Sequence, residues 1–319
     1  MKRVNADPRR IHYGRFYGLS GDETPAGHGT GDDLPLVAVT GNCQAGSLRR
    51  LLESTGGADA VLIPPVHELT ANDVPHLRAL LARADVLVAQ PVRDGYRGLP
   101  IGWREQAAML PGHATVVRYP VMRWAGLHPW QVIVRPPSDT SLTPPLVPYH
   151  DLRILLSAAG RPGFSLDDGP FAPAPAALRA AAEASIAALC SRETAHGTVP
   201  VADLLEAAPT WHTINHPDNA TLVEVARRVA TAAGIDGEVH DPGWEMLGGI
   251  RARIDDAAAA ALGVDPAPPG PDWTVDGTAV DPDELREAHL AWYADHPDAV
   301  AEGLRRHAAL IEMLTGEPA

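Results

Sequence analysis

The residues best suited to chemistry in this chain lie in the segment TGNCQAG, at positions 40–46. Cys43 stands between a short apolar run and a segment with helical periodicity, so we expect its thiol at a helix N-terminus. The free N–H groups and the dipole there lower a cysteine pKa and favour a nucleophilic thiolate. Gly41 permits a sharp turn, and Asn42 and Gln44 bring amide donors that could hold an oxyanion. The alternative is a small cysteine that only fills space in the core.

Histidines are the second set of candidates, because a thiol nucleophile needs a base within hydrogen-bond reach and the base needs an orienting partner. Taken singly, each histidine is more often a surface or core residue than a base. Asp151 or Asp218 could orient one of the imidazoles. The candidates are His128 in GLHPW, His150 in PYHD, and His212 and His216 in WHTINHPDN.

A metal site is not expected. His212 and His216 are four residues apart, which on a helix would suit zinc. However, the intervening TIN is poor helix sequence, a proline follows directly, and the sequence offers no third ligand.

Arginines follow two of the expected strands and form the third set. Arg93 and Arg97 lie in QPVRDGYRG, and Arg118 and Arg123 come later. Guanidinium groups near the carboxyl edge of the expected sheet could bind the phosphates of a nucleotide-like cofactor, although solvated surface charge is the simpler interpretation for each one. The sequence contains no dinucleotide-binding fingerprint and no Walker motif.

The elements that must position these residues alternate between strand and helix, which predicts βαβ units and a mainly parallel sheet. We therefore expect an α/β fold, a three-layer sandwich, followed by a largely helical C-terminal region. The predicted strands span 34–40, 58–65, 85–90 and 113–120, with 131–136 as a fifth; the predicted helices span 44–55, 71–84, 176–193, 221–234, 244–263 and 282–314. Two proline-rich stretches, 135–148 and 264–273, are expected to be loops.

Composition limits the classes of function. The chain has 319 residues, two cysteines and a net charge of -14, which disfavours a disulfide framework and nucleic-acid binding. It has no secretory h-region and no stretch near the roughly 18 apolar residues that span a membrane, so we expect a cytoplasmic protein without membrane insertion. Its Ala, Gly, Pro and Arg content is of the actinobacterial, GC-rich type. Residues 1–33 read as a flexible N-terminal arm in which 11–19 either docks or stays disordered.

Several motifs, taken in order, resemble those of the polysaccharide-biosynthesis family typified by WcbI. They are GNCQ, QPVRDGYRG, YP with GLHP, YHD and TINHPDN, spread over roughly residues 34–235. The resemblance implies a WcbI-like α/β catalytic domain over 34–235. It leaves 236–319 as a helical region that packs on the core or covers it.

The resemblance implies a coenzyme A-binding protein that acts as an acyltransferase on a sugar hydroxyl. It places the family's cysteine and glutamine on Cys43 and Gln44, its two His-Pro histidines on His128 and His216, and an asparagine on Asn215. Coenzyme A, or acetyl-CoA, would be the acyl donor, with no metal. We assign cofactor binding to Gly41, Asn42, Gln44, Arg93, Arg97 and Asn215.

The expected partner is a small-molecule or saccharide acceptor, with a homodimer as an alternative to a monomer. Acyl transfer would proceed by attack of the Cys43 thiolate on the thioester, with His128 or His216 activating the acceptor hydroxyl. In a variant mechanism, histidine activates the acceptor directly. The other functions left open are a cysteine-dependent ester or thioester hydrolase, and a non-catalytic module that binds coenzyme A or a nucleotide.

Overall fold

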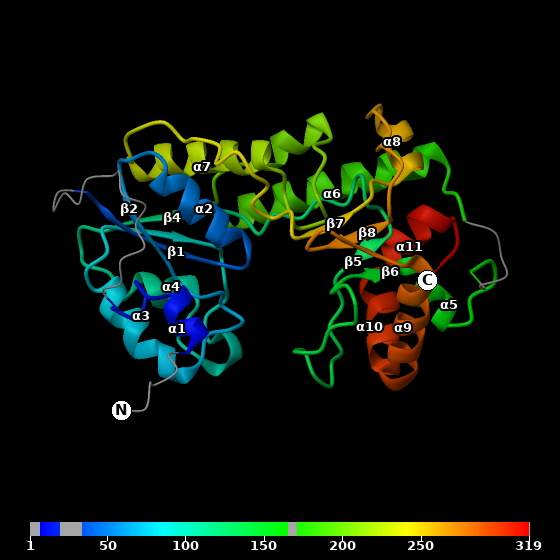
Figure 1. Cartoon of the computed structure of the whole chain (residues 1–319), viewed down its shortest axis with the longest axis horizontal. Coiled ribbons are helices and arrows are strands. Elements are labelled where there is room, and N and C mark those ends of the chain that lie inside the picture. Colours follow the sequence, from blue (N-terminus) through cyan, green and yellow to red (C-terminus); the bar gives the residue numbers. More distant parts are fainter. Residues whose placement is uncertain (1–6, 20–33, 165–170, 319) are drawn as a thin grey trace. The chain divides into compact units, whose positions relative to one another are not determined.

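The computed structural model describes residues 7–19, 34–164 and 171–318, which form two compact units (Figure 1). Each unit is built from separate stretches of the chain. Unit 1 comprises Met1–Val121, Cys190–Val201 and Asn219–Met246. Unit 2 comprises Met122–Leu189, Ala202–Asp218 and Leu247–Ala319.

A four-stranded parallel sheet with the order β2-β1-β3-β4 forms the centre of unit 1. Its strands are short apolar runs because a parallel sheet is covered on both faces. Thr40 of β1 pairs with Ala89 of β3, which pairs with Arg118 of β4, so these three strands end level at their carboxyl edge. The strands are β1 (Leu36–Thr40), β2 (Asp59–Leu62), β3 (Val86–Ala89) and β4 (Thr115–Arg118).

Helices cover both faces of this sheet (Figure 1). Helix α2, which follows β1, packs against α7 on one face, and α3 and α4 lie on the other. The prediction of a three-layer α/β sandwich is therefore confirmed. The elements are α2 (Gln44–Glu53), η1 (Ala71–Asp73), α3 (Val74–Leu81), η2 (Tyr96–Gly98), α4 (Trp103–Ala107) and α7 (Asn219–Ala233).

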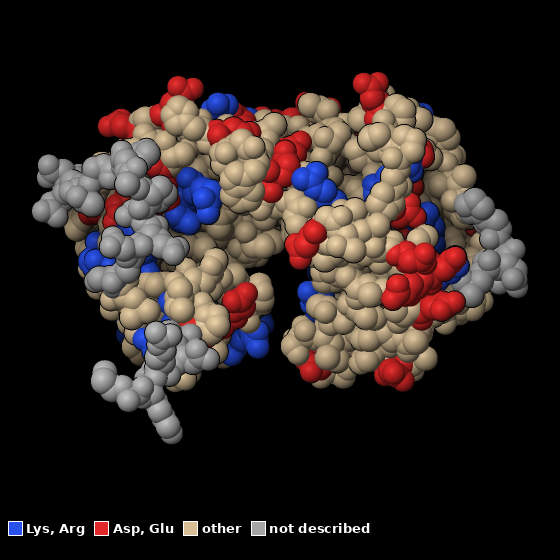
Figure 2. All heavy atoms as spheres, in the orientation of Figure 1, with Lys and Arg blue, Asp and Glu red and all other residues tan. Residues whose placement is uncertain are grey.

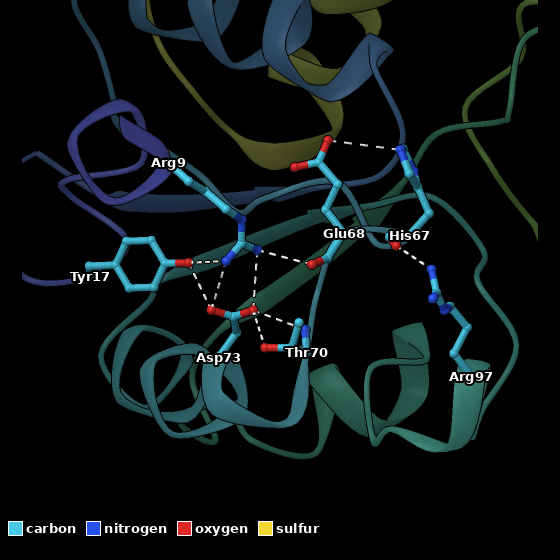
Figure 3. Close-up of polar contacts among 7 residues, drawn as sticks. All are labelled: Arg9, Tyr17, His67, Glu68, Thr70, Asp73 and Arg97. Atoms are coloured by element: carbon cyan, nitrogen blue, oxygen red, sulfur yellow. Dashed lines mark hydrogen bonds and ion pairs between the residues drawn. The ribbon is translucent and has the colours of Figure 1, made fainter. Parts of the chain in front are cut away.

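The N-terminal segment 7–19 docks on unit 1 beside the start of α3 (Figure 3). Its helix α1 (Pro8–His12) presents Arg9, which donates to both carboxylate oxygens of Asp73 at 3.2 and 3.1 Å. Tyr17 donates to Asp73 at 2.7 Å, and these bonds hold the pKa of Asp73 at about 2 although burial opposes them. Phe16 and Tyr17 are buried, so apolar packing and an ion pair both fix the segment. The rest of the predicted arm lies outside the described residues.

Unit 2 is mainly helical, as predicted for the C-terminal part of the chain. A cluster of buried side chains that includes Trp130, Leu155 and Tyr293 joins its helices. The helices are α5 (Leu152–Ala158), α6 (Pro175–His196, which ends in unit 1), η3 (Ala202–Ala207), α8 (Asp256–Leu262), α9 (Pro282–Asp295), α10 (Pro297–Arg306) and α11 (Ala308–Thr315).

The strands of unit 2 correct two predictions. Residues 131–136 do not extend the parallel sheet, because β5 (Gln131–Val132) pairs antiparallel with β6 (His150–Asp151). The helix predicted over 244–263 is confined to α8, since two glycines interrupt the pattern and Asp255 caps a new helix start. The chain before it forms β7 (Ile250–Ala252), which pairs antiparallel with β8 (Trp273–Val275), and β8 pairs with β9 (Thr278–Val280).

The surface carries both signs of charge. On the face drawn in Figure 2, acidic and basic side chains are interspersed among the described residues. None of the helices in the described parts of the chain is both long and apolar enough to span a bilayer.

Candidate functional site

Cys43 lies where the sequence predicts it, in the turn from β1 into α2 at the carboxyl edge of the sheet. It is the N-cap residue of α2, and its side chain is exposed and makes no capping bond. Ligands of open α/β sheets bind at this edge. The thiol is therefore free of any disulfide and stands at an edge suited to binding a substrate.

A buried glutamine ties the residues on either side of Cys43 together. The side-chain oxygen of Gln90, at the end of β3, accepts from the Asn42 N–H at 2.9 Å. Its amide nitrogen donates to Gln44 Oε1 at 3.0 Å and to Asn42 Oδ1 at 3.2 Å. Asn42 Oδ1 also accepts from the Gln44 N–H at 3.0 Å. The network fixes the backbone before and after the thiol, so it holds Cys43 in place.

Gly41 is required by close approach and not by an unusual dihedral angle. A Cβ at this position would lie 2.8 Å from Gln90 Oε1 and closer still to the hydroxyl of Tyr119. Tyr119, which follows β4, is fully buried and donates to the Thr40 carbonyl at 3.1 Å. Three strand ends thus meet beneath the turn with room only for a hydrogen at Gly41.

The pKa of Cys43 is shifted in the direction opposite to the one expected from the sequence. Desolvation by the surrounding protein raises the pKa of Cys43 to about 11, although the backbone N–H groups of Cys43 and Gln44 favour the thiolate. The side chain is open to solvent yet enclosed by enough protein atoms for desolvation to outweigh these donors. Cys43 is therefore a thiol at neutral pH in the ligand-free protein.

The two arginines assigned to cofactor binding follow β3 in the same unit. Arg97 adopts a left-handed backbone conformation, with a φ of 55°, and donates to the His67 carbonyl (Figure 3). Arg93 is exposed, and we find no hydrogen bond or ion pair from it to the described residues. Among the described residues neither guanidinium pairs with a carboxylate, and Arg93 also keeps all its donors for a ligand.

In unit 2 the two His-Pro motifs, far apart in sequence, come together. The turn from His212 to His216 is closed by the His212 N–H, which donates to the His216 carbonyl at 2.9 Å. The Trp124 N–H donates to the Ile214 carbonyl at 2.8 Å, which joins the loop of the first motif to this turn. The His128 ring bonds the Trp211 carbonyl through Nε2 at 2.9 Å.

The two motif histidines differ in how their rings are engaged. His128 is buried, and burial lowers its pKa while the carbonyls of Trp211 and Arg253 oppose this. Burial lowers the pKa of His216 to about 4, and its Nδ1 has no hydrogen-bond partner among the described residues. Both rings are therefore neutral at pH 7, and His216 retains an unengaged ring nitrogen.

Asn215 and Tyr149 complete this second cluster. The Tyr149 hydroxyl donates to Asn215 Oδ1 at 2.8 Å and accepts from Thr213 Oγ1 at 2.9 Å. The Tyr149 ring meets the His216 ring edge-on, with centroids 6.2 Å apart. The hydroxyl of Tyr149 thereby fixes the turn that carries His216.

Two further sequence candidates, His150 and Asp151, have structural roles. His150 is buried between the Tyr293 hydroxyl, at 2.7 Å, and the Val134 carbonyl, at 3.2 Å. Asp151 forms a two-pronged ion pair with Arg153 and caps α5, so it does not orient an imidazole as proposed. Among the described residues, no three side chains are arranged to hold a metal ion.

The structure thus gathers Cys43, Asn42 and Gln44 in unit 1, and His128, Asn215 and His216 in unit 2. Sequence reasoning missed Gln90, Tyr119 and Tyr149. For Gln90 a signal existed, because a polar residue that ends an apolar strand beside β1 must lie at the same sheet edge as Cys43.

Comparisons with known proteins agree with this architecture. The family profile described as polysaccharide biosynthesis enzyme WcbI matches residues 36–238. No curated protein matches the chain. The chain is similar to a solved structure of WcbI, with a TM-score of 0.68 and 20% sequence identity. That structure is described as a novel polysaccharide biosynthesis enzyme, in its native form without a disulfide bond between coenzyme A and one of its cysteines. The likeness covers 89% of this chain and 100% of that one.

Proposed function

Because the chain belongs to the WcbI family of polysaccharide biosynthesis enzymes, we propose that it is an acyltransferase that uses coenzyme A thioesters. It moves an acyl group, in the simplest case acetyl from acetyl-CoA, to a hydroxyl of a saccharide or other small acceptor. The observation that carries the proposal is the placement of Cys43 at the N-terminus of α2, within the motif GNCQ. The description of the similar structure names coenzyme A together with a cysteine, which supports this choice of donor.

Two orders of events deliver the acyl group, and they differ in the role of Cys43. In the covalent route the Cys43 sulfur bonds to the thioester carbonyl carbon, and its proton passes through a base to the coenzyme A sulfur, which leaves as the thiol. The acceptor oxygen then displaces Cys43, and the acceptor proton passes through the base to the Cys43 sulfur. In the direct route the acceptor oxygen attacks the thioester itself, its proton passes through the base to the coenzyme A sulfur, which leaves as the thiol, and Cys43 lines the site. The raised pKa of Cys43 weighs toward the direct route, since the thiolate is scarce at neutral pH.

The base is one of the two motif histidines, His128 or His216, as the sequence predicts. Both rings are neutral at pH 7, as a base must be. His216 Nδ1 has no hydrogen-bond partner among the described residues, but it is enclosed by protein atoms. His128 bonds a backbone carbonyl through Nε2 and so holds the NHP turn. The oxyanion role expected of Asn42 and Gln44 stays a prediction, supported by the fixed position that Gln90 gives both residues.

Intact-mass spectrometry of the full chain incubated with acetyl-CoA tests the proposal, with Cys43→Ala and Cys43→Ser beside the wild type. One added acetyl group that maps to Cys43 and is lost in both variants supports the covalent route. Turnover without an adduct, retained in Cys43→Ser, supports the direct route.

Coenzyme A binding is measured in parallel by calorimetry. Binding without transfer to any hydroxyl acceptor would point to a binding module, and acetyl-CoA consumed by water alone would point to a hydrolase. Absence of coenzyme A binding would remove the proposal.

A further inference from the structure

Unit 2 contains a pocket of about 520 Å³ to which nothing above assigns a ligand. This volume lies in the range of small-molecule sites, about 300–1,000 Å³. Most of its walls come from the loops around β5 and β6, from helix α5, and from the stretch 252–289. All of that stretch lies beyond residue 238, where the family match ends. This chain therefore forms one wall of the pocket from sequence outside the family profile.

Aromatic rings make up part of the pocket lining. Trp273 of β8 is half-buried and lines the cavity, and its ring stacks on Tyr149 with centroids 5.4 Å apart and planes 26° apart. Trp130 lies edge-on to Phe171, with centroids 6.0 Å apart, and also lines the cavity. Rings fixed in this way offer flat apolar surface to a ligand at little cost in conformational entropy.

Charged side chains line the pocket as well, Arg153 among them, whose guanidinium lies 5.5 Å from the centre of the Trp130 ring. Their pairing limits what can bind. Arg153 is held by both oxygens of Asp151, with contacts of 2.6–3.2 Å, and Arg253 by both oxygens of Asp256, each at 2.8 Å. The third arginine of the lining, Arg286, bonds a carboxylate on its own helix.

The carboxylates outnumber the guanidinium groups, since two further aspartates, Asp255 and Asp272, also line the cavity. A phosphate would have to displace a carboxylate from a guanidinium group and approach the remaining carboxylates. Such a pocket is unfavourable for a polyanion.

The carboxylates and guanidinium groups together offer closely spaced acceptors and donors, which match the vicinal hydroxyls of a ring. The aromatic rings in the same lining match the C–H face of that ring. His128, one of the motif histidines, lines the pocket as well, and Tyr149 connects it to the turn of His216.

We propose that this pocket binds an uncharged saccharide ring, with the ring face on Trp273 and the hydroxyls on the aspartates and arginines of the lining. The identification of this sugar as the acyl acceptor rests on the proposed function, whereas sugar binding itself does not. The stretch 252–289 then selects the acceptor, and it selects against phosphorylated sugars.

The test is saturation-transfer NMR and calorimetry on the full chain with methyl glucoside, methyl mannoside and methyl galactoside, and with the phosphate ester of glucose. At least one glycoside is expected to bind more tightly than the phosphate ester. Trp273→Ala should weaken that binding about tenfold, by removal of the stacked ring. Ser157→Trp, which fills the pocket from α5 and leaves Trp273 in place, should abolish it.

Trp244→Ala is the matched control, since Trp244 is 51% exposed and belongs to unit 1. Circular dichroism reports whether each variant is folded. Binding of none of the glycosides, tighter binding of the phosphate ester, or equal affinity in Ser157→Trp would overturn the inference. If glycosides fail while coenzyme A binds and acyl transfer occurs, only the pocket assignment falls. If glycosides bind and coenzyme A does not, only the proposed acyltransferase falls.

Discussion

Replacement of Gln90 by leucine tests whether the amide network beneath Cys43 sets the reactivity of its thiol. Leucine is close in size to glutamine but removes four hydrogen bonds, to the Asn42 N–H, to Asn42 Oδ1, to Gln44 Oε1 and to the Pro120 carbonyl. Each bond contributes about 1 kcal/mol net, and a buried group left without its partner costs about 1–3 kcal/mol. Because the bonds share one side chain they are not additive, so we expect Gln90→Leu to lower the free energy of unfolding by about 2–4 kcal/mol.

The assay pairs urea denaturation with alkylation of Cys43 by iodoacetamide, followed by peptide mass spectrometry. Gln90→Leu should lower the denaturation midpoint and change the alkylation rate, since Asn42 and Gln44 flank the thiol. Gln106→Leu is the matched control, because Gln106 is also fully buried in unit 1 and donates a single bond to the Ile101 carbonyl at 2.7 Å. It should lower stability by about 1 kcal/mol and leave Cys43 unchanged. Equal midpoints and equal alkylation rates in the two variants would refute the reasoning.

Three further outcomes are expected. Gly41→Ala should abolish coenzyme A binding and lower the denaturation midpoint, because the added methyl group would lie 2.8 Å from Gln90 Oε1. Gly46→Ala is the control and should be neutral or stabilising, because its Cβ meets only Leu62, at 3.7 Å. Equal behaviour of the two variants would contradict the close packing at Gly41. Alkylation of Cys43 should accelerate with pH up to about 11, and a plateau near pH 7 would rule out the raised pKa. Burial lowers the pKa of His150 from 6.5 to about 4, so the unfolded chain binds a proton at this residue before the folded chain does. The free energy of unfolding should therefore fall as the pH drops from about 6.5 to about 4. His150→Gln should flatten this pH dependence, measured as the urea midpoint at each pH, and an unchanged pH dependence would exclude His150 as its source.

The sequence predicts the sheet of unit 1 well because its signals are local. Apolar runs bounded by turn residues predict β1 to β4, and their alternation with helices predicts parallel pairing. In unit 2 the same reasoning is weaker, since an apolar run indicates a strand but not its partner, and β5 pairs with a two-residue strand. A stronger signal was available at Asp276 and Gly277, where a DG pair with φ angles of 48° and 79° turns the β8–β9 hairpin.

The candidate site was predictable in its motifs and not in its electrostatics. A helix N-terminus can be read from sequence, so the position of Cys43 follows from its neighbours. Desolvation depends on atoms brought in by distant segments, so the direction of its pKa shift does not. The tie between Tyr149 and Asn215 likewise depends on tertiary contacts across 66 residues of chain.

The interleaving of the two units has a consequence for how the protein is made. The chain passes from one unit to the other at 121/122, 189/190, 201/202, 218/219 and 246/247. Unit 1 lacks α7 until residue 233 has been synthesised, so one face of its sheet is incompletely covered while the chain is still on the ribosome. A truncation after residue 121 would remove α7 and leave that face covered by α2 alone. Folding of this protein should therefore be largely post-translational, with aggregation of nascent chains as its characteristic hazard.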